Sequence, residues 1–399
     1  MTDKIPITSP VPAVITTCEV NDLHGTGVTV KRIVGSTPNV LSIRSMDLYG
    51  GNHDFGRVSV RLTQRGLSKQ KAVQNTVRAL AGYNIRQVYC VPYVPDDLVT
   101  AIALHDVYKA PLAAHIMDDQ NISTPNIPDN LMEEFLAKCS LVLVTCPELQ
   151  RAYETKFGVR CWLLPSLVAD QLISTFQPAR ESKCSGSNGG ALLGSISSQR
   201  YFERLCATVN GAQIQLDWYN GSVQAFDNSK YSSLSDAQQI GIRPCGLLPE
   251  QQLAETLKGY SYLVAPTGRL DDVDDNPRLW RIFFAVGAAN LPVITLGDPA
   301  TSAAHFVQRF DVGVNCSYEG DGLRRAVDGL VAGPAYARLR HNAALIAPRL
   351  STKGMSDWLW ASIDLGKPVD SRFEELLTRT PGGGSELKAP DCCEHNGTG

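Results

Sequence analysis

Residues 141–164 read LVLVTCPELQRAYETKFGVRCWLL, and this stretch decides the fold class. It opens on an unbroken apolar run at 141–144, which predicts a strand buried on both faces. Residues 147–157 follow with helical spacing, and the chain leaves this helix at Gly158. A second apolar run stands at 161–164. A strand, a helix and another strand in this order indicate a parallel sheet covered by helices.

The same alternation continues along the chain in both directions. The first half predicts further strands and helices at 13–17, 28–33 (helix or extended), 68–80, 87–91, 97–108, 112–117 and 130–138. A segment rich in Ser and Gly near 178–190 predicts a domain boundary. The second half predicts elements at 191–194, 213–216, 261–266, 281–289, 291–294, 301–310 and 313–314. We therefore expect an α/β protein with domains at 1–180 and 190–350, a helical segment at 351–379 and a disordered tail at 380–399.

Composition excludes several classes of protein. The chain has 37 basic and 40 acidic side chains, a formal net charge of -3, so a dedicated nucleic-acid binder is not expected. At 43% hydrophobic and 19% charged residues it is typical of a packed globular protein. No apolar run reaches the roughly 18–20 residues of a membrane span, and the start lacks the apolar region of a secretory signal. We expect a cytoplasmic protein and leave open a peripheral contact with the cytosolic face of a membrane.

The eleven cysteines predict buried free thiols rather than a metal site. They form no CxxC pair, and they lie mostly inside apolar stretches. Cys392 and Cys393 are adjacent in a polar, Gly-rich segment with no matching pair elsewhere, which makes a poor zinc site. No metal is therefore expected.

Two polar segments follow predicted strands at the edge where open α/β sheets bind ligands. His24-Gly25-Thr26-Gly27 comes after the first strand, and its glycines either let the backbone approach a phosphate or sugar or simply form a tight turn. Asp118 and Asp119 follow the strand at 112–117. Their carboxylates either act on a bound substrate or cap the next turn.

Five stretches resemble patterns of one enzyme class: VLVTCPEL at 142–149, WLLPS at 162–166, GLLPEQQL at 246–253, YLVAPT at 262–267 and AANLPVI at 288–294. Together with the glycine loop, they make the chain similar to the glycosyltransferases that have two Rossmann-like domains, the GT-B fold. Family 4 of the retaining enzymes is the most similar. The likeness is loose and extends to about residue 350.

This resemblance implies a function and a set of site residues. The donor is a nucleotide-sugar bound to the second domain, used as a co-substrate, and no other cofactor is implied. The acceptor is a glycan, a lipid-linked sugar or a small molecule, and transfer retains the anomeric configuration. The implied catalytic residues are Asp118 and His24, with His53, His105 and His115 as unranked further candidates, and Asp119 contacts the acceptor. The oligomeric state is not implied.

The implied donor site lies around the helix at 281–289. Its amino terminus carries a partial positive charge, and the Arg281 guanidinium can grip two phosphate oxygens. An exposed salt bridge is the alternative role for Arg281, and Arg269 and Arg278 align less clearly with the family. The remaining implied donor-binding residues are Asn276, Asp275, Gly25, Thr26 and Gly27.

One departure from the family puts activity in doubt. The family carries two glutamates eight positions apart around this helix, and the second, which holds the ribose, falls here on Phe284 or Ala285. Either Asp274 or Asp275 replaces it, or the donor is unusual, or activity is lost. A non-catalytic binding or assembly protein is therefore the alternative function.

Two further interpretations are disfavoured. The run Asp272-Val273-Asp274 matches the DxD metal motif of single-domain glycosyltransferases, but its place in a second domain favours a solvated loop. A Rossmann-type dehydrogenase would require a three-glycine fingerprint in the first turn, which this chain lacks.

Overall fold

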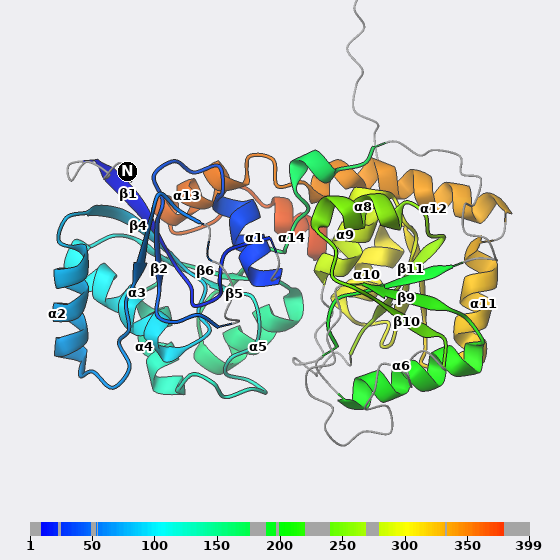
Figure 1. The fold of residues 1–399 in the computed structure, drawn as a ribbon, viewed down its shortest axis with the longest axis horizontal. Coiled ribbons are helices and arrows are strands. Elements are labelled where there is room, and N and C mark those ends of the chain that lie inside the picture. The colour runs from blue at the N-terminus through cyan, green and yellow to red at the C-terminus, as the bar shows by residue number, and fades with distance from the viewer. Residues whose placement is uncertain are drawn as a thin grey trace, which may run out of the picture.

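The computed structural model describes residues 9–22, 25–48, 53, 55–175, 189–196, 199–219, 240–268, 279–331 and 333–378. These residues form two parallel sheets with helices on their faces, one in each half of the chain (Figure 1). The α/β class and the presence of two Rossmann-like sheets are therefore confirmed. The predicted linker near 178–190 and the tail from 380 lie largely or wholly outside the described residues.

The first sheet has the strand order β3-β2-β1-β4-β5-β6-β7. Its strands are β1 (Pro10–Ile15), β2 (Leu41–Arg44), β3 (Val58–Arg61), β4 (Asn84–Cys90), β5 (Leu112–Ile116), β6 (Leu141–Val144) and β7 (Trp162–Leu163). Its helices are α1 (Gly25–Val34), α2 (Lys69–Leu80), α3 (Pro95–Tyr108), α4 (Asp129–Lys138) and α5 (Pro147–Phe157), and a short 3-10 helix (Asp170–Leu172) follows β7. The order changes direction between β1 and β4, which makes their carboxyl ends a topological switch point.

The second sheet has the order β10-β9-β8-β11-β12-β13. Its strands are β8 (Gly190–Leu193), β9 (Leu216–Tyr219), β10 (Ile242–Gly246), β11 (Tyr262–Pro266), β12 (Val293–Leu296) and β13 (Gly313–Cys316). Its helices are α6 (Gln199–Ala212), α8 (Glu250–Leu257), α9 (Leu279–Ala289), α10 (Ser302–Arg309) and α11 (Gly320–Val331). Here the switch point lies between β8 and β11.

The structure corrects the sequence prediction in several places. Strands β2, β3 and β10 and helices α6 and α8 occupy intervals for which no element was predicted. Helix α1 begins at Gly25, inside the predicted polar turn. The strand expected at 213–216 begins only at Leu216, because Gln213 adopts a left-handed conformation (φ 51°) just after the end of α6. Among the described residues, no helix is both long enough and apolar enough to cross a membrane.

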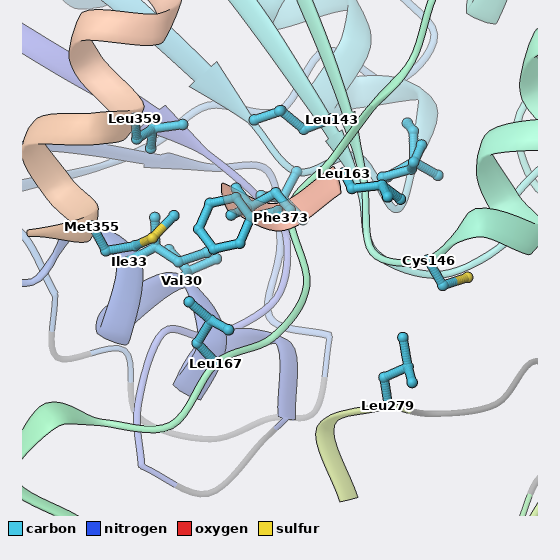
Figure 2. Close-up of a cluster of buried hydrophobic side chains, with 14 of the residues drawn as sticks. Val30, Ile33, Leu143, Cys146, Leu163, Leu167, Leu279, Met355, Leu359 and Phe373 are labelled. Carbon is cyan, nitrogen blue, oxygen red and sulfur yellow. The ribbon is translucent and has the colours of Figure 1, made fainter. Parts of the chain in front are cut away.

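The last helices return to the first sheet. After α12 (Gly333–Ile346) and a 3-10 turn (Ala347–Leu350), α13 (Met355–Leu365) packs on α1 and β4, and α14 (Arg372–Leu377) packs on β7 (Figure 1). Figure 2 shows Phe373 of α14 among side chains of α1, α13 and β7. The Glu374 Oε1 atom accepts the Leu163 backbone N–H at 2.9 Å, so α14 also covers the open edge of β7.

A buried carboxylate joins the two halves. Glu148 lies in the first turn of α5, and its two oxygens accept the Ser302 backbone N–H at 2.7 Å and the Ser302 hydroxyl at 2.8 Å. Ser302 begins α10, so this carboxylate is near the positive ends of two helices. Because α5 follows β6 and α10 follows β12, the carboxyl edges of the two sheets face each other at this contact.

Replacing Glu148 with alanine should destabilise the protein by about 2–3 kcal/mol, since the buried donors of Ser302 would lose their acceptor. Ser302→Ala removes only the hydroxyl and should cost about 1 kcal/mol. Urea denaturation of both variants and the double variant measures the coupling between the two residues. Strictly additive effects would contradict a direct contact between the halves.

Candidate functional site

A chain of hydrogen bonds lies at the switch point of the first sheet. The Tyr93 hydroxyl, three residues beyond β4, donates to the Asp118 carboxylate, which follows β5. Since that bond uses the only proton of the phenol, the Thr26 hydroxyl of α1 donates to the Tyr93 oxygen at 2.5 Å. The structure thus links Thr26 and Asp118 through a tyrosine that the sequence analysis did not select.

The surroundings keep the Tyr93 hydroxyl protonated and leave the Asp118 carboxylate accessible. Burial, followed by the charge of Asp118, raises the pKa of Tyr93 well above its ordinary value, so its hydroxyl remains a donor. The Cys18 thiol lies nearby, and burial together with the charges of Asp118 and Asp97 raises its pKa. Cys18 is therefore not a thiolate nucleophile. Asp118 is exposed and can accept a hydrogen bond from a bound hydroxyl group.

Asp97 fixes the backbone at Tyr93 through hydrogen bonds. Its buried carboxylate accepts the backbone N–H groups of Tyr93 and Val94 at 3.0 and 3.3 Å. Burial raises the pKa of Asp97 from its ordinary 3.8 to about 7, although these hydrogen bonds act in the opposite direction. Asp97 therefore supports the site through the backbone.

This raised pKa predicts a specific pH dependence. The Asp97 carboxyl group has a higher pKa in the folded than in the unfolded protein. Its contribution to the free energy of unfolding is therefore fully present below pH 4 and is lost as pH rises to about 7. Asp97→Asn stays neutral, so the free energy of unfolding of the variant relative to wild type should rise between pH 4 and 7, by an amount on the order of 3 kcal/mol. Urea denaturation across this range measures the difference, in which the titration of all other groups cancels.

Asp96→Asn is the matched control, because it removes a charge from the same helix start and leaves the buried carboxyl group intact. It should keep the wild-type pH dependence. Equal pH profiles for Asp97→Asn and wild type would contradict the assignment.

The two glycines of the loop have different roles. A Cβ atom on Gly27 would lie 2.1 Å from the Glu19 carbonyl oxygen and 3.1 Å from the Asn21 nitrogen. Gly27 therefore lets α1 pack directly against the segment after β1. Gly25 is exposed, and a Cβ atom there would have no atom within 4 Å. Both glycines lie in the first turn of α1 rather than in a tight loop turn, and close packing accounts for Gly27. Of the two, only Gly25 leaves space for a ligand.

The other aspartate, Asp119, caps the next turn. Its two carboxylate oxygens accept four backbone N–H groups, those of Asn121, Ile122, Ser123 and Thr124, at 2.6–3.3 Å. This is the geometry of the capping alternative. Contact between Asp119 and an acceptor substrate remains only a prediction from the resemblance.

The three described histidines among the candidates, His53, His105 and His115, each have a hydrogen-bond partner within the protein. His115 is fully buried between the Tyr89 hydroxyl at 2.6 Å and the Leu164 carbonyl at 3.0 Å, and burial lowers its pKa to about 3. His53 accepts the Val20 N–H at 3.1 Å, and His105 lies 2.9 Å from the Ala110 carbonyl. His24 lies outside the described residues.

On the second sheet, Arg281 lies at the carboxyl edge beside the end of β8. It is only 5% exposed, and its Nη2 atom donates to the Ser195 carbonyl. Gly194 packs so closely that an added Cβ would come 2.6 Å from the Trp280 ring and 3.0 Å from the Arg281 Nε atom. From the sequence alone, a guanidinium that is accessible to phosphate is expected here. The structure places the guanidinium at the expected end of α9 but covers it with the loop after β8.

The position of the missing glutamate is buried between the halves. Phe284 and Ala285 are 1% and 0% exposed, and the Arg32 guanidinium lies 5.9 Å from the centre of the Phe284 ring. Arg32 also donates to Glu250 of α8 at 3.3 Å and to the Leu167 carbonyl at 2.6 Å. No hydrogen-bond acceptor for a ribose is present in these two side chains.

The remaining predicted donor residues lie outside the described part of the chain. These are Asn276 and Asp275, together with Asp272, Asp274, Arg269 and Arg278. Within the described ranges, no group of three or more His, Cys, Asp or Glu side chains could hold a metal ion.

No protein-family model matches the chain, and no curated protein matches it in sequence. Solved structures are similar in fold. HepE of Anabaena with UDP and glucose has a TM-score of 0.66 and 14% identity, covering 89% of this chain and 99% of that chain. The trehalose-phosphate synthase of Burkholderia xenovorans with glucose-6-phosphate has a TM-score of 0.63 and 11% identity, covering 89% of this chain and 100% of that chain. Sucrose-phosphate synthase of Thermosynechococcus elongatus has a TM-score of 0.61 and 14% identity, covering 89% of this chain and 98% of that chain. The chain therefore has the two-Rossmann-domain GT-B fold.

Proposed function

We propose that this protein is a glycosyltransferase that moves a sugar from a nucleotide-sugar to an acceptor hydroxyl group. The observation that carries the proposal is the chain from Thr26 through Tyr93 to the exposed carboxylate of Asp118. It lies at the switch point of one sheet, while at the carboxyl edge of the facing sheet Arg281 and the start of α9 lie beneath the loop after β8. Solved proteins of this fold that bind UDP and sugars support it, as does the resemblance to the retaining family 4.

Each of these groups has a role that its chemistry allows. The Asp118 carboxylate orients the acceptor hydroxyl or stabilises positive charge at the anomeric carbon. Gly25 admits the donor close to the backbone, and Arg281 with the α9 amino terminus neutralises the departing diphosphate. We propose transfer of a hexose with retention and without a metal, to a glycan, lipid-linked or small-molecule acceptor.

A test for turnover uses a panel of nucleotide-sugars and measures release of nucleoside diphosphate. Each donor is supplied with a mixture of mono- and oligosaccharides as acceptors. The proposal expects release from at least one donor that rises on adding acceptor. Release from none of the donors would contradict it.

The second candidate is a non-catalytic protein that keeps the GT-B fold for binding or assembly. It is favoured by the buried Phe284 and Ala285, which remove the ribose acceptor of the family. This candidate expects no release from any donor and no rise in melting temperature with nucleoside diphosphates. A melting shift without turnover would instead indicate a nucleotide-binding protein that lacks activity.

A further inference from the structure

The edge strand β13 of the second sheet borders a groove. The groove has a volume of about 570 Å³ and is lined by β13, α11 and α12. Of the described strands, only β12 pairs with β13. The opposite edge of β13 therefore faces the groove.

The register determines which backbone groups point into the groove. The carbonyl groups of Val312 and Cys316 accept N–H groups of Val293 and Gly297, on the β12 side. Because backbone groups alternate along a strand, those of Gly313 and Asn315 point the other way. Both residues line the groove, where their N–H and C=O groups can pair with an added strand.

Two other sheet edges in the structure are protected. Glu374 of α14 accepts the Leu163 N–H on β7, and β10 contains Pro244, which has no N–H to offer. Within the described part of the chain, the β13 edge has neither a proline nor a side-chain acceptor along Gly313–Cys316. An uncovered edge strand is a template for pairing with another chain.

The charge of the groove wall selects the partner. Arg325 is exposed on α11 and lines the groove, and no acidic side chain among the described residues pairs with it. At the other end, Arg338 of α12 pairs with Asp311. Among the described residues, the lining thus carries one positive charge without an ion pair beside the open strand, although the whole chain has a net charge of -3.

We propose that this groove binds an extended acidic segment of a partner protein, which adds to the second sheet as a seventh strand along β13. Four extended residues, the length of β13, span about 13 Å and present side chains alternately to the groove wall and to solvent. The acidic side chains lie toward Arg325. This inference is independent of the proposed glycosyl transfer.

The test titrates the full chain into two peptides labelled at their amino termini, fluorescein-(Glu-Val)3-amide and fluorescein-(Lys-Val)3-amide, and follows fluorescence anisotropy. The acidic peptide should bind, and the basic one should not. Arg325→Glu should weaken binding of the acidic peptide at least about tenfold, because attraction becomes repulsion. Arg324→Glu is the matched control, since Arg324 is the adjacent exposed residue, does not line the groove and pairs with Asp328. It should change binding less than about twofold.

Strand addition has its own readout. Amide hydrogen exchange should slow at Gly313 and Asn315 when the acidic peptide binds, and a peptide N-methylated at alternate residues should not bind. The proposal is overturned by absence of binding, by equal effects of the two arginine variants, or by binding without protection of β13. Concentration-dependent dimerisation that Arg325→Glu abolishes would show that a second copy of the chain is the occupant, which also overturns it.

Discussion

Gly27→Ala should strongly destabilise the first domain, and Gly25→Ala should leave its stability nearly unchanged. The new Cβ at position 27 would lie 2.1 Å from the Glu19 carbonyl oxygen, and the obstacle is backbone, which cannot rotate away. The segment after β1 and the start of α1 must then move apart, at a cost of about 3 kcal/mol or more. Urea denaturation monitored by circular dichroism measures both variants.

Gly25 is the control for this prediction because the same substitution there meets open space. Equal stability of Gly27→Ala and wild type would contradict the close packing of α1. The Gly25→Ala variant also separates the two interpretations of the glycine loop. If the first turn of α1 approaches the donor, the Gly25→Ala variant should have a higher KM for nucleotide-sugar. An unchanged KM would indicate that Gly25 does not contact the donor.

Asp118→Asn should lower kcat/KM by about 10²–10³ while the protein stays folded, because a carboxylate that faces the developing charge is lost. The residue is exposed, and an asparagine oxygen can still accept the Tyr93 hydroxyl. Tyr93→Phe should reduce the rate less, by about tenfold, since the carboxylate remains but its orienting donor is lost. Steady-state release of nucleoside diphosphate measures both variants.

Asp119→Asn gives the matched comparison. It removes the neighbouring carboxylate, which caps a turn through four backbone N–H groups. Its expected effect is a loss of stability of about 1–2 kcal/mol with kcat preserved. If Asp118→Asn retained full activity, or if both variants lost activity only in proportion to stability, Asp118 would not act at the reaction centre.

The sequence predicts the central, apolar strands because local patterns determine them, and it misses the outer strands β2, β3 and β10. The apolar run at β6 and the helical spacing of α5, with Gly158 in the left-handed region (φ 65°), give their bounds without error. Strand order is not a local property. The tyrosine link forms because β4 lies between β1 and β5, which brings Tyr93 between Thr26 and Asp118. Its place just after a predicted strand was the only available signal.

Contacts between the halves are the part that local patterns cannot give. Glu148 is an ordinary acidic residue in a first helical turn until Ser302, 154 positions later, is found against it. The burial of Arg281 also depends on a distant segment, the loop at Gly194 and Ser195. A cation at a helix start is visible in sequence, but whether another loop covers it is not.

The central claim is that a nucleoside diphosphate binds where the loop after β8 meets the first turn of α9. Calorimetric titration of UDP, GDP and ADP into the full chain, followed by amide hydrogen exchange of the bound state, tests this claim most directly. We expect at least one nucleotide to bind with a Kd in the micromolar range and to slow exchange at 193–196 and 279–283. Absence of binding at millimolar nucleotide, or protection confined to other segments, would contradict it.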